Sequence, residues 1–83
     1  MIYPVYSVRD LKGDFYSPRI DQNDDSCVRW FSMTVNTPET MLNFSPGDFQ
    51  LFKIGEFDSA SGRLIPLDLP HLVTSAVDVF RKE

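Results

Sequence analysis

The stretch Asp48–Pro66, DFQLFKIGEFDSASGRLIP, constrains the fold of this chain more than any other part of it. Two apolar runs flank the turn-forming cluster DSASG, in which Gly62 can adopt the positive φ that tight hairpin turns require. This pattern predicts a β-hairpin in which Leu51–Phe57 pairs antiparallel with Arg63–Leu67.

The first strand of this hairpin has apolar residues on both faces. Alternation places Phe49, Leu51 and Phe57 on one face, and Phe52 and Ile54 on the other. A strand that is apolar on both sides is typical of the middle of a sheet. We therefore expect this strand to be the centre of the sheet.

The length of the chain limits how its core can form. With 83 residues there is room for a single domain, residues 1–83, which buries only ~60 to 65% of its unfolded surface. Seven Phe, three Tyr and one Trp supply a dense core. Self-association is a second way to bury apolar area, so we expect a homodimer that forms through the edge strand Ile2–Val8 or the C-terminal segment.

Charge and cysteine content exclude several classes of protein. The net charge of −4 argues against a surface that attracts nucleic acid everywhere, although a local basic patch stays open. The single cysteine, Cys27, cannot form an internal disulfide, which fits a reducing cytoplasm. No signal peptide pattern and no run of about 20 apolar residues is present, so we expect no membrane partner.

The N-terminal third predicts a strand pair. Ile2–Val8 is rich in β-branched and aromatic residues, and Pro4 favours a sheet edge or a strand start. A turn at Gly13 then leads to a second apolar pair, Phe15 and Tyr16. Together these residues predict a hairpin.

A helix is predicted after this hairpin. Asn23 or Asp24 can cap it, and it should stop near Asn36, ahead of Pro38. Its apolar residues follow the helical spacing i, i+3 and i+7: Val28, Phe31 and Val35.

The segments on either side of the Asp48–Pro66 hairpin are less regular. Residues 37–47 predict a loop whose apolar anchors Met41, Leu42 and Phe44 tuck beneath it. After Leu67, a helical stripe follows a cap at Asp68, with basic residues at its end, although frequent Val and Thr permit a strand. The stripe and its basic end comprise Leu69, Leu72, Val73, Ala76, Val77, Phe80, Arg81 and Lys82.

The expected fold is therefore α+β. A small antiparallel sheet of order β-β-α-β-β packs against one helix and is followed by a C-terminal element, which we expect to be helical.

The usual signatures of catalysis and metal binding are not met. The run Asp21–Ser26 starts like a calcium loop, but Ser26 and Ser32 stand where that loop needs its glycine and its bidentate glutamate. Helix capping explains the run better. The single His71 and the single Cys27 cannot complete a zinc site. We predict no catalytic residue, no metal and no cofactor, and hence no enzyme.

Basic and aromatic residues alternate in the N-terminal region. Arg9, Lys12 and Arg19 interleave with Phe15 and Tyr16, which is typical of surfaces that bind single-stranded nucleic acid through phosphate contacts and base stacking. A solvated hairpin with Phe15 in the core is the alternative.

Arg29 and Trp30, which are adjacent on the predicted helix, allow the same two interpretations. The candidate nucleic-acid-binding residues are Arg9, Lys12, Tyr16, Arg19, Arg29 and Trp30.

Several motifs also resemble a known family. YPVYSVRD, GDFYSP, VRWF, VNTPETMLNFSPGDF and especially LFKIGEFDSASGRLIP are similar to the small non-structural protein of gokushoviruses, single-stranded DNA bacteriophages of the Microviridae. The resemblance covers most of residues 3–66. It departs mildly at Gly47, where the family often has an acidic residue, and it carries little beyond Leu67.

The resemblance implies a protein made in the cytoplasm of the infected bacterium and absent from the capsid. It implies a role at the stage that links single-stranded genome synthesis to packaging, with no catalytic residues. Two functions remain open. One is weak, non-sequence-specific binding of single-stranded DNA. The other is an assembly role that contacts the replication initiator or the procapsid without binding DNA.

Overall fold

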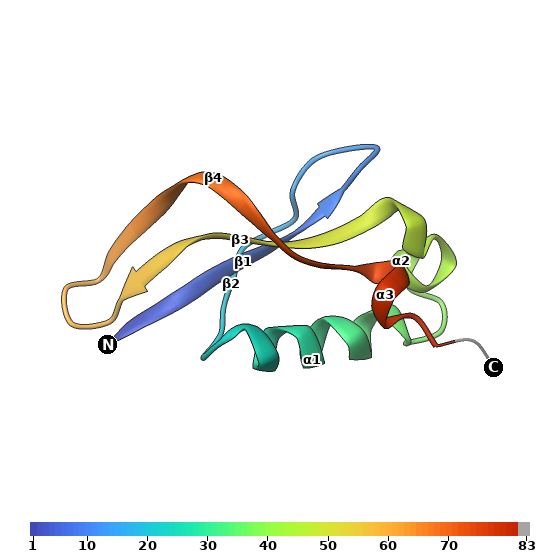
Figure 1. The fold of residues 1–83 in the computed structure, drawn as a ribbon, viewed down its shortest axis with the longest axis horizontal. Coiled ribbons are helices and arrows are strands. Elements are labelled where there is room, and N and C mark those ends of the chain that lie inside the picture. Colours follow the sequence, from blue (N-terminus) through green and yellow to red (C-terminus); the bar gives the residue numbers. More distant parts are fainter. Residues whose placement is uncertain (82–83) are drawn as a thin grey trace.

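A four-stranded antiparallel sheet with strand order β2-β1-β3-β4 runs through the molecule (Figure 1). The computed structural model describes residues 1–81. The strands are β1 (Ile2–Asp10), β2 (Arg19–Ile20), β3 (Phe49–Asp58) and β4 (Arg63–Ser75). β3 lies between β1 and β4, so the predicted hairpin and its central strand are confirmed.

The helices cover only part of this sheet. α1 (Asp24–Val35) lies along one face, while the short helices and one 3₁₀ turn gather at one end (Figure 1). These short elements are α2 (Met41–Phe44), η1 (Pro46–Asp48) and α3 (Ala76–Val79). The predicted α+β class, with one packed helix and a helical C-terminal element, is confirmed. No helix within residues 1–81 is long and apolar enough to cross a membrane.

Local sequence explains where α1 begins and ends. The side chain of Asn23 accepts a hydrogen bond from the Ser26 amide, which caps the first turn as predicted. The helix ends at Asn36, also as predicted. Its buried residues are Cys27, Phe31 and Val35, whereas Val28 is half-buried beside them.

The core lies between α1 and one face of β1 and β3. We call this side the helix face of the sheet. The buried core cluster comprises Tyr6, Val8, Cys27, Phe31, Val35, Leu42, Phe49, Leu51 and Ala76. Successive strand residues point to opposite faces. Val5, Ser7 and Arg9 of β1, and Phe52 opposite Ser7, therefore lie on the other side, which we call the open face.

A β-bulge moves Phe57 away from the core. The pairing of β1 with β3 shifts between Val5 and Tyr6, which leaves Ile54 as an extra residue in β3. An extra residue reverses the alternation beyond it. Phe57, paired with Tyr3, consequently lies on the open face, and the prediction that it shares a face with the core residues of β3 is wrong.

The C-terminal helix is shorter than the helical stripe indicated. β4 continues to Ser75, and only Ala76–Val79 is helical. The sequence after Leu67 is compatible with a helix and with a strand. In the structure its residues up to Ser75 pair with β3, with Leu72 opposite Phe52. The proposed cap at Asp68 therefore lies inside a strand. The expectation for Lys82 lies outside the described residues.

The predicted loop after α1 contains a helical turn, and only one of its three anchors is buried. Leu42 belongs to the core cluster, but the side chains of Met41 and Phe44 point outward with 60% and 83% of their surface exposed. The Thr40 side chain accepts from the Asn43 amide and caps this turn. A helix of four residues turns only one side toward the core. Leu42 occupies that side, so Met41 and Phe44 cannot also be buried.

The far end of the sheet extends beyond α1. The N-terminus and the turn between β3 and β4 project past the first turn of the helix (Figure 1). We call this projection, residues 2–4 and 56–65, the arm. It carries large exposed apolar side chains, among them Ile2 and Leu64.

Candidate nucleic-acid interface

The segment between β1 and β2 folds back along the outer edge of β1. The predicted partner strand at Phe15 and Tyr16 is reduced to a single bridge between Arg9 and Phe15, and the paired strand lies later, at Arg19–Ile20. The Tyr16 amide donates to the Val8 carbonyl at 2.8 Å. The Ser7 hydroxyl donates to the Tyr16 carbonyl at 2.6 Å. These bonds hold the segment against the sheet.

A groove opens at this edge, between residues 15–19 and the side of α1. Its volume is about 520 Å³, and we call it the edge groove. It is lined by Ser7, Val8, Phe15, Tyr16, Ser17, Arg19 and Trp30. Three of the six predicted binding residues, Tyr16, Arg19 and Trp30, therefore come together here.

Arg19 and Trp30 form one wall of the edge groove. The Arg19 guanidinium carbon lies 4.0 Å from the centroid of the Trp30 ring, as in a cation–π pair. A terminal nitrogen of Arg19 lies 3.6 Å from a carboxylate oxygen of Asp21. Trp30 also packs against the core cluster. One face of the Trp30 ring is thus covered by a cation, which leaves less of this ring available for base stacking.

Tyr16 also lines the edge groove. Its ring lies edge-to-face with that of Phe49, with the centroids 5.9 Å apart. Nevertheless 45% of Tyr16 is exposed. The contact with Phe49 holds the Tyr16 ring in place. Its exposed part remains available to a ligand.

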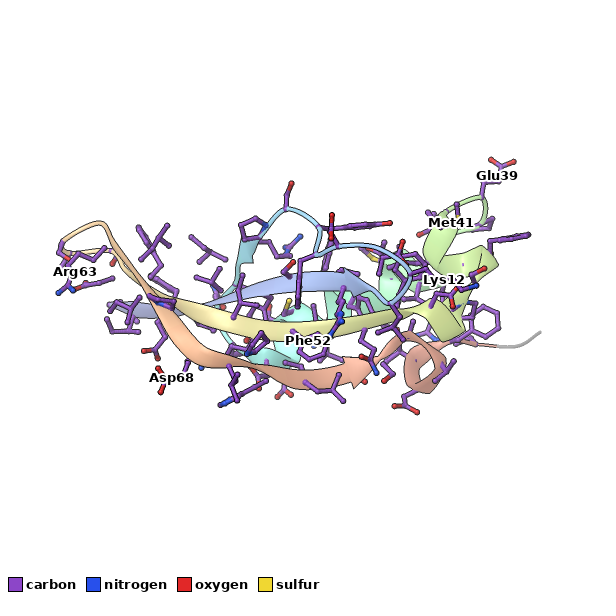
Figure 2. All side chains as sticks on the ribbon, turned by 90° about the horizontal axis from the view of Figure 1, so that it is seen from above. Lys12, Glu39, Met41, Phe52, Arg63 and Asp68 are labelled. Atoms are coloured by element: carbon purple, nitrogen blue, oxygen red, sulfur yellow. The ribbon has the colours of Figure 1, made fainter. Side chains whose placement is uncertain are left out.

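Arg9 lies beside the groove, on the open face, next to Phe15, which lines the groove. The Arg9 guanidinium carbon is 5.6 Å from the centroid of the Phe15 ring, and Phe15 meets Phe52 edge-to-face at 5.7 Å. Figure 2 shows Phe52 near the middle of this face. Among residues 1–81, Arg9 makes no salt bridge. Arg9 is therefore an exposed cation with no carboxylate to compete for it.

The basic residues do not form one patch. Arg19 pairs with Tyr6, so it lies on the helix-face side of the edge, whereas Arg9 lies on the open face. Of the two, only Arg19 lines the edge groove. A strand that touched both guanidinium groups would cross the edge of the sheet.

Lys12 and Arg29 lie outside the groove. The Lys12 ammonium is 3.6 Å from a carboxylate oxygen of Asp48, and 78% of the side chain is exposed. Figure 2 shows Lys12 toward the end of the molecule where Met41 lies. Arg29 instead lines a separate depression together with acidic residues, including Asp25 and Asp78, so its neighbours oppose phosphate binding.

Sequence reasoning missed the partner of Arg19. Asp21 was considered only as part of a calcium-like run, although it stands two residues after Arg19. In an extended segment, residues i and i+2 point to the same side. That spacing is the signal from which their ion pair could have been found.

Two buried ionisable groups near α1 serve the fold. The Tyr6 hydroxyl donates to a carboxylate oxygen of Asp24, and burial together with this bond raises the pKa of Tyr6 far above its usual value. Burial also raises the pKa of the Cys27 thiol to about 11, so the reactive thiolate is disfavoured. Within the described part of the chain, no three potential metal-ligating side chains gather.

Comparison with known proteins gives one match. A family model described as "Phage ORF5 protein" matches residues 3–79. No curated protein and no solved structure matched the chain.

Proposed function

The chain belongs to the phage ORF5 protein family, and we propose that it is an accessory protein that binds single-stranded DNA weakly and without sequence preference. The resemblance to gokushoviral non-structural proteins supports an assignment to the Microviridae. It also supports action in the bacterial cytoplasm, at the stage that links genome synthesis to packaging.

The edge groove is the observation that carries this proposal. It brings the exposed ring of Tyr16 next to Phe15 and the Arg19 guanidinium. Proteins that bind single strands without sequence preference combine stacking surfaces with cations that follow the backbone.

The charges of the molecule predict modest affinity. The net charge of −4 repels DNA, and Asp21 already neutralises Arg19. Arg9 remains for phosphate contacts, together with Lys12, whose salt bridge with Asp48 is 78% exposed on the lysine side and therefore weak. Two such contacts predict a log–log salt slope of roughly −1.4, at ~0.7 per phosphate.

A salt titration of the Arg9→Ala variant tests the proposal. We expect anisotropy of a labelled oligothymidylate to report salt-dependent binding by the unmodified protein, and the variant to bind with a slope of roughly −0.7. Arg63→Ala is the matched control, since it removes the same charge at the opposite end of the sheet, as Figure 2 shows. No binding at low salt by protein shown to be folded would overturn the proposal.

A second candidate function rests on the arm. Ile2 and Leu64 of the arm are 51% and 68% exposed, and no helix covers this end of the sheet (Figure 1). Exposed apolar surface of this kind marks protein contacts. The alternative is thus an assembly factor that contacts the replication initiator or the procapsid, or a second copy of itself, without binding DNA.

A further inference from the structure

We infer that the edge groove holds one unpaired nucleobase, which stacks between the Tyr16 ring and the Arg19 guanidinium plane, with Trp30 as the residue that positions Arg19. This inference rests on the proposed function and specifies how the same site recognises its ligand. It assigns Arg19 to base stacking, whereas phosphate binding falls to Arg9.

The groove has the size and lining that a base requires. Its volume of about 520 Å³ falls within the range of ~300 to 1,000 Å³ typical of small-molecule sites. The aromatic rings of Phe15 and Tyr16 and the Arg19–Trp30 pair all line it. No carboxylate is among the lining residues, so nothing in the wall itself repels a nucleotide.

The surroundings of Arg19 favour stacking over phosphate binding. Its charge is already paired with Asp21, whose side chain is 13% exposed and whose carboxylate would repel an incoming phosphate. Its side chain remains 37% exposed and lines the groove. Guanidinium planes stack on unpaired bases, and this interaction needs a flat open face and no free charge.

Trp30 holds that plane in place. The guanidinium carbon of Arg19 lies 4.0 Å from the centroid of the Trp30 ring, and Trp30 itself packs against the core cluster. An arginine fixed between a ring and a carboxylate loses little further freedom when a base arrives, which improves binding. Trp30 acts through Arg19 and is a positioning residue.

Stacking, rather than the hydroxyl groups of Ser7 and Ser17 that line the groove, explains the expected lack of sequence preference. The Ser7 hydroxyl donates to the Tyr16 carbonyl and Ser7 is 2% exposed, so it cannot contact a base edge. Stacking on a flat surface accepts every base, because each has a π face.

The single tryptophan, Trp30, gives a direct test. Its fluorescence should change saturably when deoxyadenosine monophosphate is added to the full chain at millimolar concentration. The matched probe is deoxyribose 5-phosphate, which carries the phosphate without a base and should leave the signal unchanged. Equal responses to both probes would show phosphate binding and overturn the inference.

Substitutions separate stacking from charge. Arg19→Lys keeps the positive charge but removes the plane, so we expect several-fold weaker oligonucleotide binding with an unchanged salt slope. Tyr16→Leu should weaken binding roughly 5- to 100-fold, while Tyr16→Phe keeps it. Arg29→Lys and Tyr3→Leu are controls outside the groove and should bind like the unmodified protein. Full binding by both Arg19→Lys and Tyr16→Leu would contradict the inference.

Failure of this inference can be told apart from failure of the proposed function. Oligonucleotide binding without any base-dependent change in Trp30 fluorescence would remove the base site and leave DNA binding intact. Absence of both signals, with circular dichroism showing a folded chain, would overturn both.

Discussion

At the scale of single residues, the core contains polar groups that stay neutral because they are buried. Cys27 is fully buried on α1, and burial raises the pKa of its thiol to about 11. The Tyr6 hydroxyl lies under the first turn of the same helix and donates to Asp24. Both groups stay protonated in the folded chain to a higher pH than usual. The free energy of unfolding should therefore depend on pH in the alkaline range.

We predict that stability falls as pH rises from 9 to 11. A folded-state pKa above the unfolded value means that stability is fully present below the unfolded pKa and is lost as pH rises through the folded one. For Cys27 the loss amounts to about 2 to 3 kcal/mol at most. Urea denaturation at a series of pH values measures it. Cys27→Ala should reduce the pH dependence in this window, and an unchanged curve would show that the thiol does not contribute.

At the scale of elements, β3 and β4 approach unusually closely next to the bulge. A Cβ atom placed on Gly55 would lie 2.7 Å from the Ile65 carbonyl oxygen on the neighbouring strand. That oxygen belongs to the backbone and cannot move aside without distorting the sheet. Gly55 thus permits the strand contact on which the arm depends.

Gly55→Ala should therefore lower the free energy of unfolding by about 1 to 3 kcal/mol through overpacking. Gly47→Ala is the matched control, because no atom lies within 4 Å of its added Cβ. Chemical denaturation of the two variants checks the difference. Equal stability of both would mean that β4 shifts freely at this point.

At the scale of the whole molecule, the shape is elongated, with extents of 44 × 23 × 18 Å, and the two ends differ. One end is closed by α2, η1 and α3, while the arm at the other end has no helix beneath it (Figure 1). Pro66 and Pro70 interrupt the outer edge of β4, which disfavours continuous strand addition there. Any self-association should therefore use apolar side chains of the arm.

We predict that the protein forms dimers through the arm at high micromolar concentration, and that Leu64→Glu shifts them to monomers. Leu64 is 68% exposed, so the change should not disturb the monomer fold. Light scattering measures the mass, with Met41→Glu as a control at the opposite end of the molecule. A monomeric mass for the unmodified protein at this concentration would exclude the homodimer.

Local patterns in the sequence determined the elements whose signals lie within a few residues. The cap at Asn23, the end of α1 at Asn36 and the turn at Gly62 depend on neighbouring atoms. These features follow from hydrogen-bonding and backbone preferences that any fold would respect.

Tertiary structure alone decided the features that depend on contacts between distant residues. The segment before Ser75 has both helical and strand periods, and pairing with β3 selected the strand. One bulge at Ile54 moved Phe57 to the open face. Arg19 contacts Trp30 of α1 because β2 pairs with β1, which packs against that helix. Periodicity specifies which side of an element is apolar, but register and packing between elements decide what that side meets.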